Sequence, residues 1–221
     1  MHFVFDLDGT IVDHRGRTYE LHTRYCAERG LVPVPSGEYV ARKSEGASER
    51  HTVRDSIPAA EMDRYMAWKR AHIESDESLA LDTLWPGMVD LLGQLRDCAT
   101  LVLLTSRQSE AQAIKELHRL GIAQLFTAII AAPNDGRPVG KLNALKPYLD
   151  RHAVAPTSVV LIGDTECEIA VARVLGATCL SVTWGVRGLF YLAALNQDHI
   201  VKSVAELGEL LRTSYCPKMH F

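Results

Sequence analysis

The segment Phe3–Asp13, which reads FVFDLDGTIVD, constrains the fold more than any other part of the chain. It opens with three consecutive apolar residues, a pattern typical of a buried parallel strand. Two acids, Asp6 and Asp8, follow directly and are separated by one leucine. Because ligands of open α/β sheets bind outside the carboxyl ends of the strands, both carboxylates are expected at the mouth of a site. Close carboxylates repel each other unless a cation intervenes, so the pair favours a hard divalent ion such as Mg²⁺.

Further apolar runs predict four more strands, each followed by a helical pattern. These runs are Leu101–Leu104, Ala128–Ala132, Ser158–Ile162 and Cys179–Thr183. A turn-rich segment, Pro133–Gly140, separates the run Ala128–Ala132 from Lys141 and a helix over Leu142–His152. Alternating strands and helices call for a parallel sheet with right-handed crossovers and helices on both faces. We therefore predict an α/β fold with a Rossmann-like, three-layer core.

The region between the first two predicted strands has a helical pattern throughout. Apolar residues recur at three- and four-residue steps between Met62 and Ile73, which indicates an amphipathic helix. No strand is expected between Asp13 and Trp85. We therefore predict an all-helical domain over 14–84, inserted into a core domain made of 1–13 and 85–221.

Composition and charge exclude several classes of protein. The 221-residue chain is 47% hydrophobic and has a net charge of −3, so no basic surface for nucleic acid is indicated. No apolar run approaches the roughly 18 residues of a membrane span. The odd number of cysteines and their lack of CxxC spacing argue against a disulfide scaffold or structural zinc site, so we expect a reduced, cytoplasmic protein. The cysteines are Cys26, Cys98, Cys167, Cys179 and Cys216.

Polar residues follow the predicted strands in a particular order. Asp6 and Asp8 come first, then Thr105, then Lys141, and finally Asp164 after a glycine. This order resembles the four motifs of the haloacid dehalogenase-like (HAD) hydrolase superfamily, whose first motif is similar to DLDGT. The sequences Pro86-Gly87 and Val182–Gly185 (VTWG) most resemble its phosphoglycolate-phosphatase-like branch.

The resemblance implies a phosphoric monoester hydrolase that works through an aspartyl-phosphate. Asp6 would be the nucleophile that attacks phosphorus. Asp8 would protonate the leaving oxygen and then activate water. The dehalogenases of the superfamily lack an acid at this second position, so Asp8 points away from carbon–halogen chemistry. The alternative for both residues is an ordinary turn or helix-capping role.

The remaining motif residues would hold the phosphoryl group. The hydroxyl of Thr105 and the backbone N–H of Ser106 would donate to phosphoryl oxygens. Lys141 would neutralise Asp6 and the transferring group. The alternatives are a helix cap for Thr105 and a solvated surface side chain for Lys141.

The same resemblance implies a Mg²⁺ site. One oxygen of Asp6, the backbone carbonyl of Asp8 and the carboxylate of Asp164 would bind the metal. Glu168 lies one helical turn beyond Asp164 and faces the same side. Glu168 has three alternative roles: it binds the metal directly, binds it through water, or pairs with Lys141. Nearby Cys167 is either a small packed residue or a site of oxidation.

The helical insert resembles the cap that the superfamily places over its active site. Arg42 and Lys43, in a segment with Gly46, are candidates for binding an anionic part of the substrate, Arg42 by a two-pronged contact. The alternative is that both are solvated charges on a helix surface.

The predicted function is hydrolysis of a small phosphorylated metabolite with Mg²⁺ as cofactor. A phosphomutase acting on a sugar phosphate would use the same aspartyl-phosphate and is one alternative. A non-catalytic protein that binds a phosphorylated ligand is the alternative from another class.

Overall fold

The computed structural model describes residues 1–132 and 138–216, and its centre is a six-stranded parallel sheet. The strands lie in the order β5-β4-β1-β6-β7-β8. Their bounds are β1 His2–Phe5, β4 Thr100–Thr105, β5 Ala128–Ala131, β6 Val159–Gly163, β7 Thr178–Val182 and β8 His199–Val201. Strand β1 pairs with β4 on one side and β6 on the other, so its carboxyl end lies in the middle of the sheet edge.

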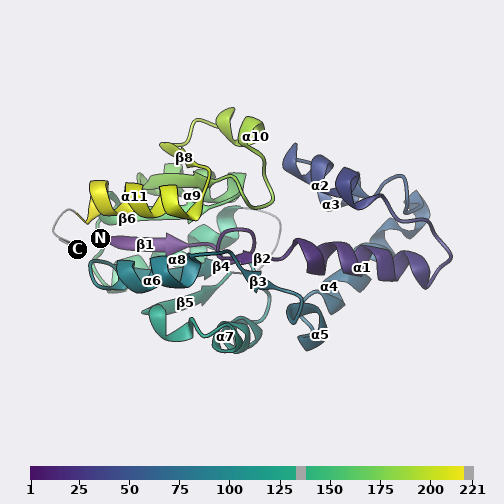
Figure 1. Ribbon diagram of the computed structural model, residues 1–221, viewed down its shortest axis with the longest axis horizontal. Helices are drawn as coiled ribbons and strands as arrows, with labels where there is room; N and C mark the ends of the chain where they lie inside the picture. The colour runs from purple at the N-terminus through teal and green to yellow at the C-terminus, as the bar shows by residue number, and fades with distance from the viewer. Residues whose placement is uncertain (133–137, 217–221) are drawn as a thin grey trace.

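Helices cover both faces of this sheet, as the alternation along β1 dictates. Phe3 and Phe5 belong to one apolar cluster, and Val4 belongs to another. The first cluster includes α6 (Met88–Arg96), α7 (Glu110–Arg119) and α11 (Val204–Tyr215). The second includes α8 (Pro138–Arg151), α9 (Glu166–Leu175) and α10 (Leu189–Ala193). The predicted three-layer α/β fold is confirmed (Figure 1).

The helices of the insert lie together beyond the carboxyl ends of the strands (Figure 1). They are α1 Arg15–Ala27, α2 Ser36–Ser44, α3 Glu49–Thr52, α4 Met62–His72 and α5 Asp76–Leu79. Tyr25, Tyr39 and Tyr65 are buried at the centre of their own apolar cluster. The described residues also form three short 3-10 turns. Ala59–Glu61 lies in the insert, and Ala123–Leu125 and Pro156–Ser158 lie in the core.

The insert is attached through a pair of two-residue strands. Strand β2 (Val12–Asp13) runs antiparallel to β3 (Thr83–Leu84). The expectation of no strand between Asp13 and Trp85 is therefore wrong at β3. Two residues are too few to display a strand periodicity, so only pairing with a distant segment defines this element.

Two other details differ from the sequence-based expectation. Strand β8 was not predicted, and α8 begins at Pro138 rather than Leu142. Lys141 accordingly lies in the first turn of α8 and does not precede it. Most of the expected loop Pro133–Gly140, namely 133–137, lies outside the described residues. Among the described residues, no helix is long and apolar enough to span a membrane.

Two of the five cysteines form a disulfide, which corrects the expectation that all are reduced. Cys98, which follows α6, is bonded to Cys216 at the end of α11, with 5.9 Å between their Cα atoms. The bond joins residues 118 positions apart, a relation that spacing alone does not reveal. Cys26, Cys167 and Cys179 are free thiols.

A buried histidine holds two segments of the insert together. The Nε2 atom of His22, in α1, accepts a hydrogen bond from the backbone N–H of Val34 at 3.1 Å. The ring also stacks on Tyr39, with the two centroids 5.7 Å apart. Burial, followed by the charge of Lys69, lowers the pKa of His22 to about 4. His22 is therefore neutral in the folded protein at pH 5, whereas an unfolded chain would protonate it.

We expect His22 to make the protein less stable in mild acid. The folded-state pKa lies below the ordinary value of about 6.5, so stability is complete above pH 6.5 and falls as pH drops towards 4. Between pH 7 and pH 5 this site should remove about 1 to 2 kcal/mol of unfolding free energy. Urea denaturation of wild type and His22→Gln at both pH values measures it. An equal loss in the two proteins would contradict the assignment.

Candidate active site

The carboxyl end of β1 presents Asp6 to a buried lysine. Lys141 Nζ donates to Asp6 Oδ1, and it also donates to Glu168 Oε1 at 2.6 Å. The side chains of all three residues are less than 10% exposed. Burial alone would lower the pKa of Lys141, but Asp6 and Glu168 outweigh it and raise that pKa. One ammonium group therefore donates hydrogen bonds to two buried carboxylates.

The pKa of Asp6 reflects this crowding. Burial raises it to about 7, with Lys141 opposing the rise and Glu168 adding to it. The backbone N–H of Asp6 continues the sheet by donating to Ile162 O at 2.9 Å, which fixes the residue beside β6. Asp6 thus lies at the centre of the sheet edge with a cation in contact.

Glu168 is held by three hydrogen bonds. Its carboxylate accepts from Lys141, from the hydroxyl of Thr165 at 2.7 Å and from the backbone N–H of Thr165 at 3.3 Å. Thr165 is the N-cap of α9 and forms a capping box with Glu168. Of the three roles that the sequence left open for Glu168, pairing with Lys141 is the one that these contacts display.

Asp164 follows β6 and lies close to Gly9 and Thr10 of the DLDGT motif. Its Oδ2 accepts from the backbone N–H of Val186 at 2.6 Å, and its Oδ1 accepts from the Thr10 hydroxyl at 3.3 Å. Burial, together with the charge of Asp6, raises the pKa of Asp164 well above its usual value. Gly9 has a φ of +92° and no room for a side chain, because a Cβ there would lie 2.2 Å from Asp164 Oδ2. The DLDGT glycine therefore permits the close approach of these two motifs.

Asp8 has different partners, which the sequence analysis did not identify. Arg107 donates from Nε and Nη2 to the two carboxylate oxygens at 2.7 and 2.8 Å, and Arg17 Nη2 donates to Oδ1. Burial alone would raise the pKa of Asp8, but the two guanidinium groups hold it well below its usual range. Arg107 comes two residues after Thr105, so its position at the end of β4 was the available sequence signal. Arg17 belongs to the insert and carried no such signal.

A second buried acid joins the same two arginines. Asp82, immediately before β3, accepts from Arg17 Nε at 3.0 Å and from Arg107 Nη2 at 3.2 Å. Burial raises the pKa of Asp82 to about 8 against the opposing charge of Arg17. The network therefore links both attachment strands of the insert to Asp8.

Thr105 and Ser106 end β4 beside these groups. Thr105 is fully buried, and its hydroxyl accepts from the backbone N–H of Arg107 at 3.4 Å. Ser106 lines a cavity of about 250 Å³ together with Asp6, Asp8 and Lys141. Cys167 also lines it, and burial raises the pKa of its thiol to about 12. Four of the site residues predicted from the sequence thus line one cavity, namely Asp6, Asp8, Ser106 and Lys141.

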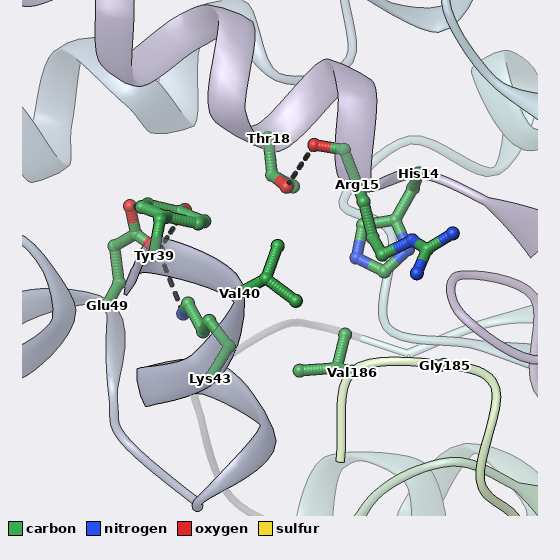
Figure 2. Close-up of a pocket in the computed structure, with 9 residues that line it drawn as sticks. All are labelled: His14, Arg15, Thr18, Tyr39, Val40, Lys43, Glu49, Gly185 and Val186. Atoms are coloured by element: carbon green, nitrogen blue, oxygen red, sulfur yellow. Dashed lines mark hydrogen bonds and ion pairs between the residues drawn. The ribbon is translucent and has the colours of Figure 1, made fainter. Parts of the chain in front are cut away.

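Arg42 and Lys43 have separate surroundings. Arg42 donates to Thr52 O at 2.7 Å and pairs with Glu38 and Asp55, whose side chains are exposed. Lys43 Nζ instead lies 2.8 Å from Glu49 and lines a smaller pocket between the insert and the core. Figure 2 shows Lys43 facing this pocket opposite Val186. Of the two candidates, Lys43 faces the space between the insert and the core.

The insert is docked on the core beside this pocket. Arg187 donates to Glu166 through Nε and Nη2 at 2.9 and 2.8 Å, and through Nη1 to Lys43 O at 2.8 Å. The backbone N–H of Gly188 donates to Ser44 O at 2.9 Å. Gly46, with a φ of +94°, lies against the ring of Tyr191, where a Cβ would come within 2.2 Å of a ring carbon. Arg187, Gly188 and Tyr191 therefore hold 43–47 against the loop after β7.

Among the described residues, no three His, Cys, Asp or Glu side chains are gathered as a ready metal cage. The expected Mg²⁺ set needs only two carboxylates, Asp6 and Asp164, because it includes a backbone carbonyl and because Mg²⁺ usually keeps several waters. The charge of Asp6 raises the pKa of Asp164, so a cation between the two carboxylates would relieve their repulsion. The donor chemistry fits a magnesium ion.

Comparison with known sequences supports the motif assignment. The family model for haloacid dehalogenase-like hydrolases matches residues 3–182. Phosphoglycolate phosphatase of Synechococcus elongatus is 26% identical over 205 residues, which cover 92% of this chain and 93% of the relative. Phosphoglycolate phosphatase of Chromobacterium violaceum is 28% identical, with coverages of 94% and 95%.

Solved structures share the fold. A haloacid dehalogenase-like family hydrolase from Streptococcus pneumoniae superposes with a TM-score of 0.78 at 24% identity, covering 93% of this chain and 95% of that one. Protein tyrosine kinase A of Mycobacterium tuberculosis superposes with a TM-score of 0.77 at 26% identity, covering 95% and 97%.

Lys141 is expected to support the fold as well as the site. Lys141→Met leaves Asp6 and Glu168 buried without their cation, and breaking a buried pair in this way costs about 3 kcal/mol or more. The control is Lys115→Met, because the pair of Lys115 with Asp76 is exposed and should contribute little to stability. Urea denaturation at pH 7.5 measures both. Equal small losses would show that Lys141 is not the cation that these carboxylates require.

Proposed function

The chain belongs to the haloacid dehalogenase-like hydrolase family, and within it we propose a Mg²⁺-dependent phosphatase that hydrolyses a small phosphorylated metabolite. The observation that carries the proposal is the contact of Asp6 with Lys141 in a cavity that Asp8 also lines. A nucleophile, an acid–base group and a buried cation are the parts that phosphoryl transfer requires. The phosphoglycolate phosphatases among its relatives support this reaction class.

The proposed reaction has two steps. The Asp6 carboxylate attacks phosphorus while the bond to the leaving oxygen breaks and Asp8 supplies that oxygen with a proton. Water, activated by Asp8, then releases phosphate from the aspartyl group. Lys141, Thr105 and Ser106 would offset charge on the phosphoryl oxygens. Asp6 needs its ionised form to attack, and the ammonium group of Lys141 favours that form.

Magnesium would be held by Asp6, the backbone carbonyl of Asp8 and Asp164. When bound, the ion supplies charge stabilisation to the transferring phosphoryl group. The supporting observation is that these carboxylates outnumber the cations that contact them. Lys141 is shared by Asp6 and Glu168, and among the described residues Asp164 accepts only from neutral donors. In this proposal Glu168 orients Lys141 and is not itself a ligand.

We propose that 14–84 is a cap over this site. Its apolar cluster is separate from the two clusters of the sheet, and its short antiparallel attachment strands are suited to act as a hinge. The contacts of Arg187 and Gly188 with 43–47 would hold the cap on the core. Lys43 would then face the part of the substrate that is remote from the phosphate.

The first test is phosphate release from a panel of phosphoesters with and without Mg²⁺. We expect release that needs the metal and that falls by at least about 1,000-fold in Asp6→Asn, since that variant lacks the nucleophile. Asp150→Asn, on an exposed position of α8, is the matched control. Retained turnover in Asp6→Asn would contradict the mechanism. An isomerised sugar phosphate in place of free phosphate would indicate a mutase, and binding without turnover would indicate a non-catalytic protein.

The docking contacts give a second expected outcome. Arg187→Met removes the hydrogen bonds to Glu166 and to 43–47, so hydrogen exchange in 43–47 should accelerate by about tenfold or more. Arg173→Met is the control, because Arg173 donates within the core to Leu195 O. Hydrogen exchange followed by mass spectrometry measures both. Unchanged exchange in Arg187→Met would mean that this arginine does not hold the insert.

A further inference from the structure

Asp8 is held in a position that conflicts with its proposed role. A general acid must bring a proton to the leaving oxygen, yet both Asp8 oxygens accept from Arg107, and Oδ1 also accepts from Arg17. Its side chain is 26% exposed and borders the cavity that contains Asp6, whereas the two arginines are 2% exposed. For Asp8 to act, its carboxylate must leave these arginines.

The arginines themselves are fixed by other partners. Arg17 donates from Nε to Asp82 at 3.0 Å and from Nη1 to Ile73 O at 2.8 Å. Arg107 Nη1 forms an ion pair with Glu116 at 2.6 Å, and its Nη2 donates to Asp82 at 3.2 Å. The nitrogens directed at Asp8 are therefore Nε and Nη2 of Arg107 and Nη2 of Arg17. They would stay in place when Asp8 moves.

The position of Asp8 in the cluster favours such an exchange. The two guanidinium groups also contact Asp82 and Glu116, which are buried and do not line the cavity, whereas Asp8 lines it. The departure of Asp8 leaves three buried donors in need of an acceptor. A planar carboxylate fits them, because the carboxylate of Asp8 already occupies that position with a two-pronged contact.

We propose that Arg17 and Arg107 form a binding site for a carboxylate of the substrate, which displaces Asp8 and releases it towards the leaving oxygen. The proposal rests on the proposed phosphatase function and narrows its substrates to phosphoesters whose leaving group carries a carboxylate. The clamp borders the same cavity as Asp6 and Lys141, so one small molecule reaches both. Arg17 lies in α1 of the insert, which makes carboxylate binding depend on the insert as well as the core.

The test compares two esters that differ only in this group, 2-phosphoglycolate and 2-hydroxyethyl phosphate. In wild type, kcat/KM should favour 2-phosphoglycolate by about 100-fold, the value of one or two charge-assisted hydrogen bonds. Arg17→Lys keeps the positive charge but loses the Nη2 donor that is directed at this carboxylate position, so this ratio should fall about tenfold. Arg24→Lys is the control, because Arg24 lies in the same helix as Arg17 but pairs with the exposed Glu77 and should leave the ratio unchanged. A wild-type ratio near one, or a proportional loss on both esters in Arg17→Lys, overturns the proposal.

A binding measurement keeps the proposal testable where Arg17→Lys does not fold. Asp8→Ala removes the competing carboxylate, so calorimetry should show affinity for 2-phosphoglycolate rising about tenfold more than affinity for 2-hydroxyethyl phosphate. An equal gain for both esters, or none, overturns the clamp. If wild type hydrolyses neither ester but Asp8→Ala shows the selective gain, the clamp stands and the phosphatase proposal fails. If wild type hydrolyses both esters equally, the phosphatase proposal stands and the clamp fails.

Discussion

Buried cations hold two of the three aspartates that gather at the carboxyl end of the sheet, and the site depends on this pairing. Strands β1 and β6 are parallel neighbours, so Asp6, Asp8 and Asp164 must meet at one edge. Each carboxylate has different hydrogen-bonding partners. Asp6 contacts Lys141, Asp8 contacts two arginines, and Asp164 accepts from a hydroxyl and a backbone N–H. The three acids are therefore not equivalent, which is what separate roles as nucleophile, acid–base group and metal ligand require.

The insert contributes to this electrostatic arrangement as well as lying beyond the sheet. Arg17 and Asp82 belong to the two ends of the inserted segment, and both join the Asp8 network. At the loop after β7, Arg187 connects the insert to Glu166, the residue that follows the helix N-cap Thr165. Movement of the insert would thus alter the partners of Asp8 on one side and of the loop after β7 on the other.

The sequence allowed much of the core and its central residues to be predicted. Apolar runs located five of the six strands of the sheet, and the order of polar residues after them brought Asp6, Lys141 and Asp164 together. Arg17 was not predicted, because its partner Asp82 lies 65 residues away and no local pattern relates them. The Cys98–Cys216 bond and the β2–β3 pair were missed for the same reason. Spacing also could not separate Lys43, which lines a pocket, from Arg42, which does not.

By itself, the sequence determined the alternation of strands and helices, the helical nature of the insert and the family to which the motifs belong. These properties are local, since they follow from hydrophobic periodicity and from residues within a few positions of one another. Only the tertiary structure decided which cation each carboxylate contacts, because an ion pair depends on the distance between segments far apart in the chain. Asp6 and Asp8 are two residues apart, yet the fold gives one a lysine from α8 and the other arginines from the insert and from the end of β4. That difference in partners, on which the proposed carboxylate clamp rests, could not be deduced from the DLDGT motif.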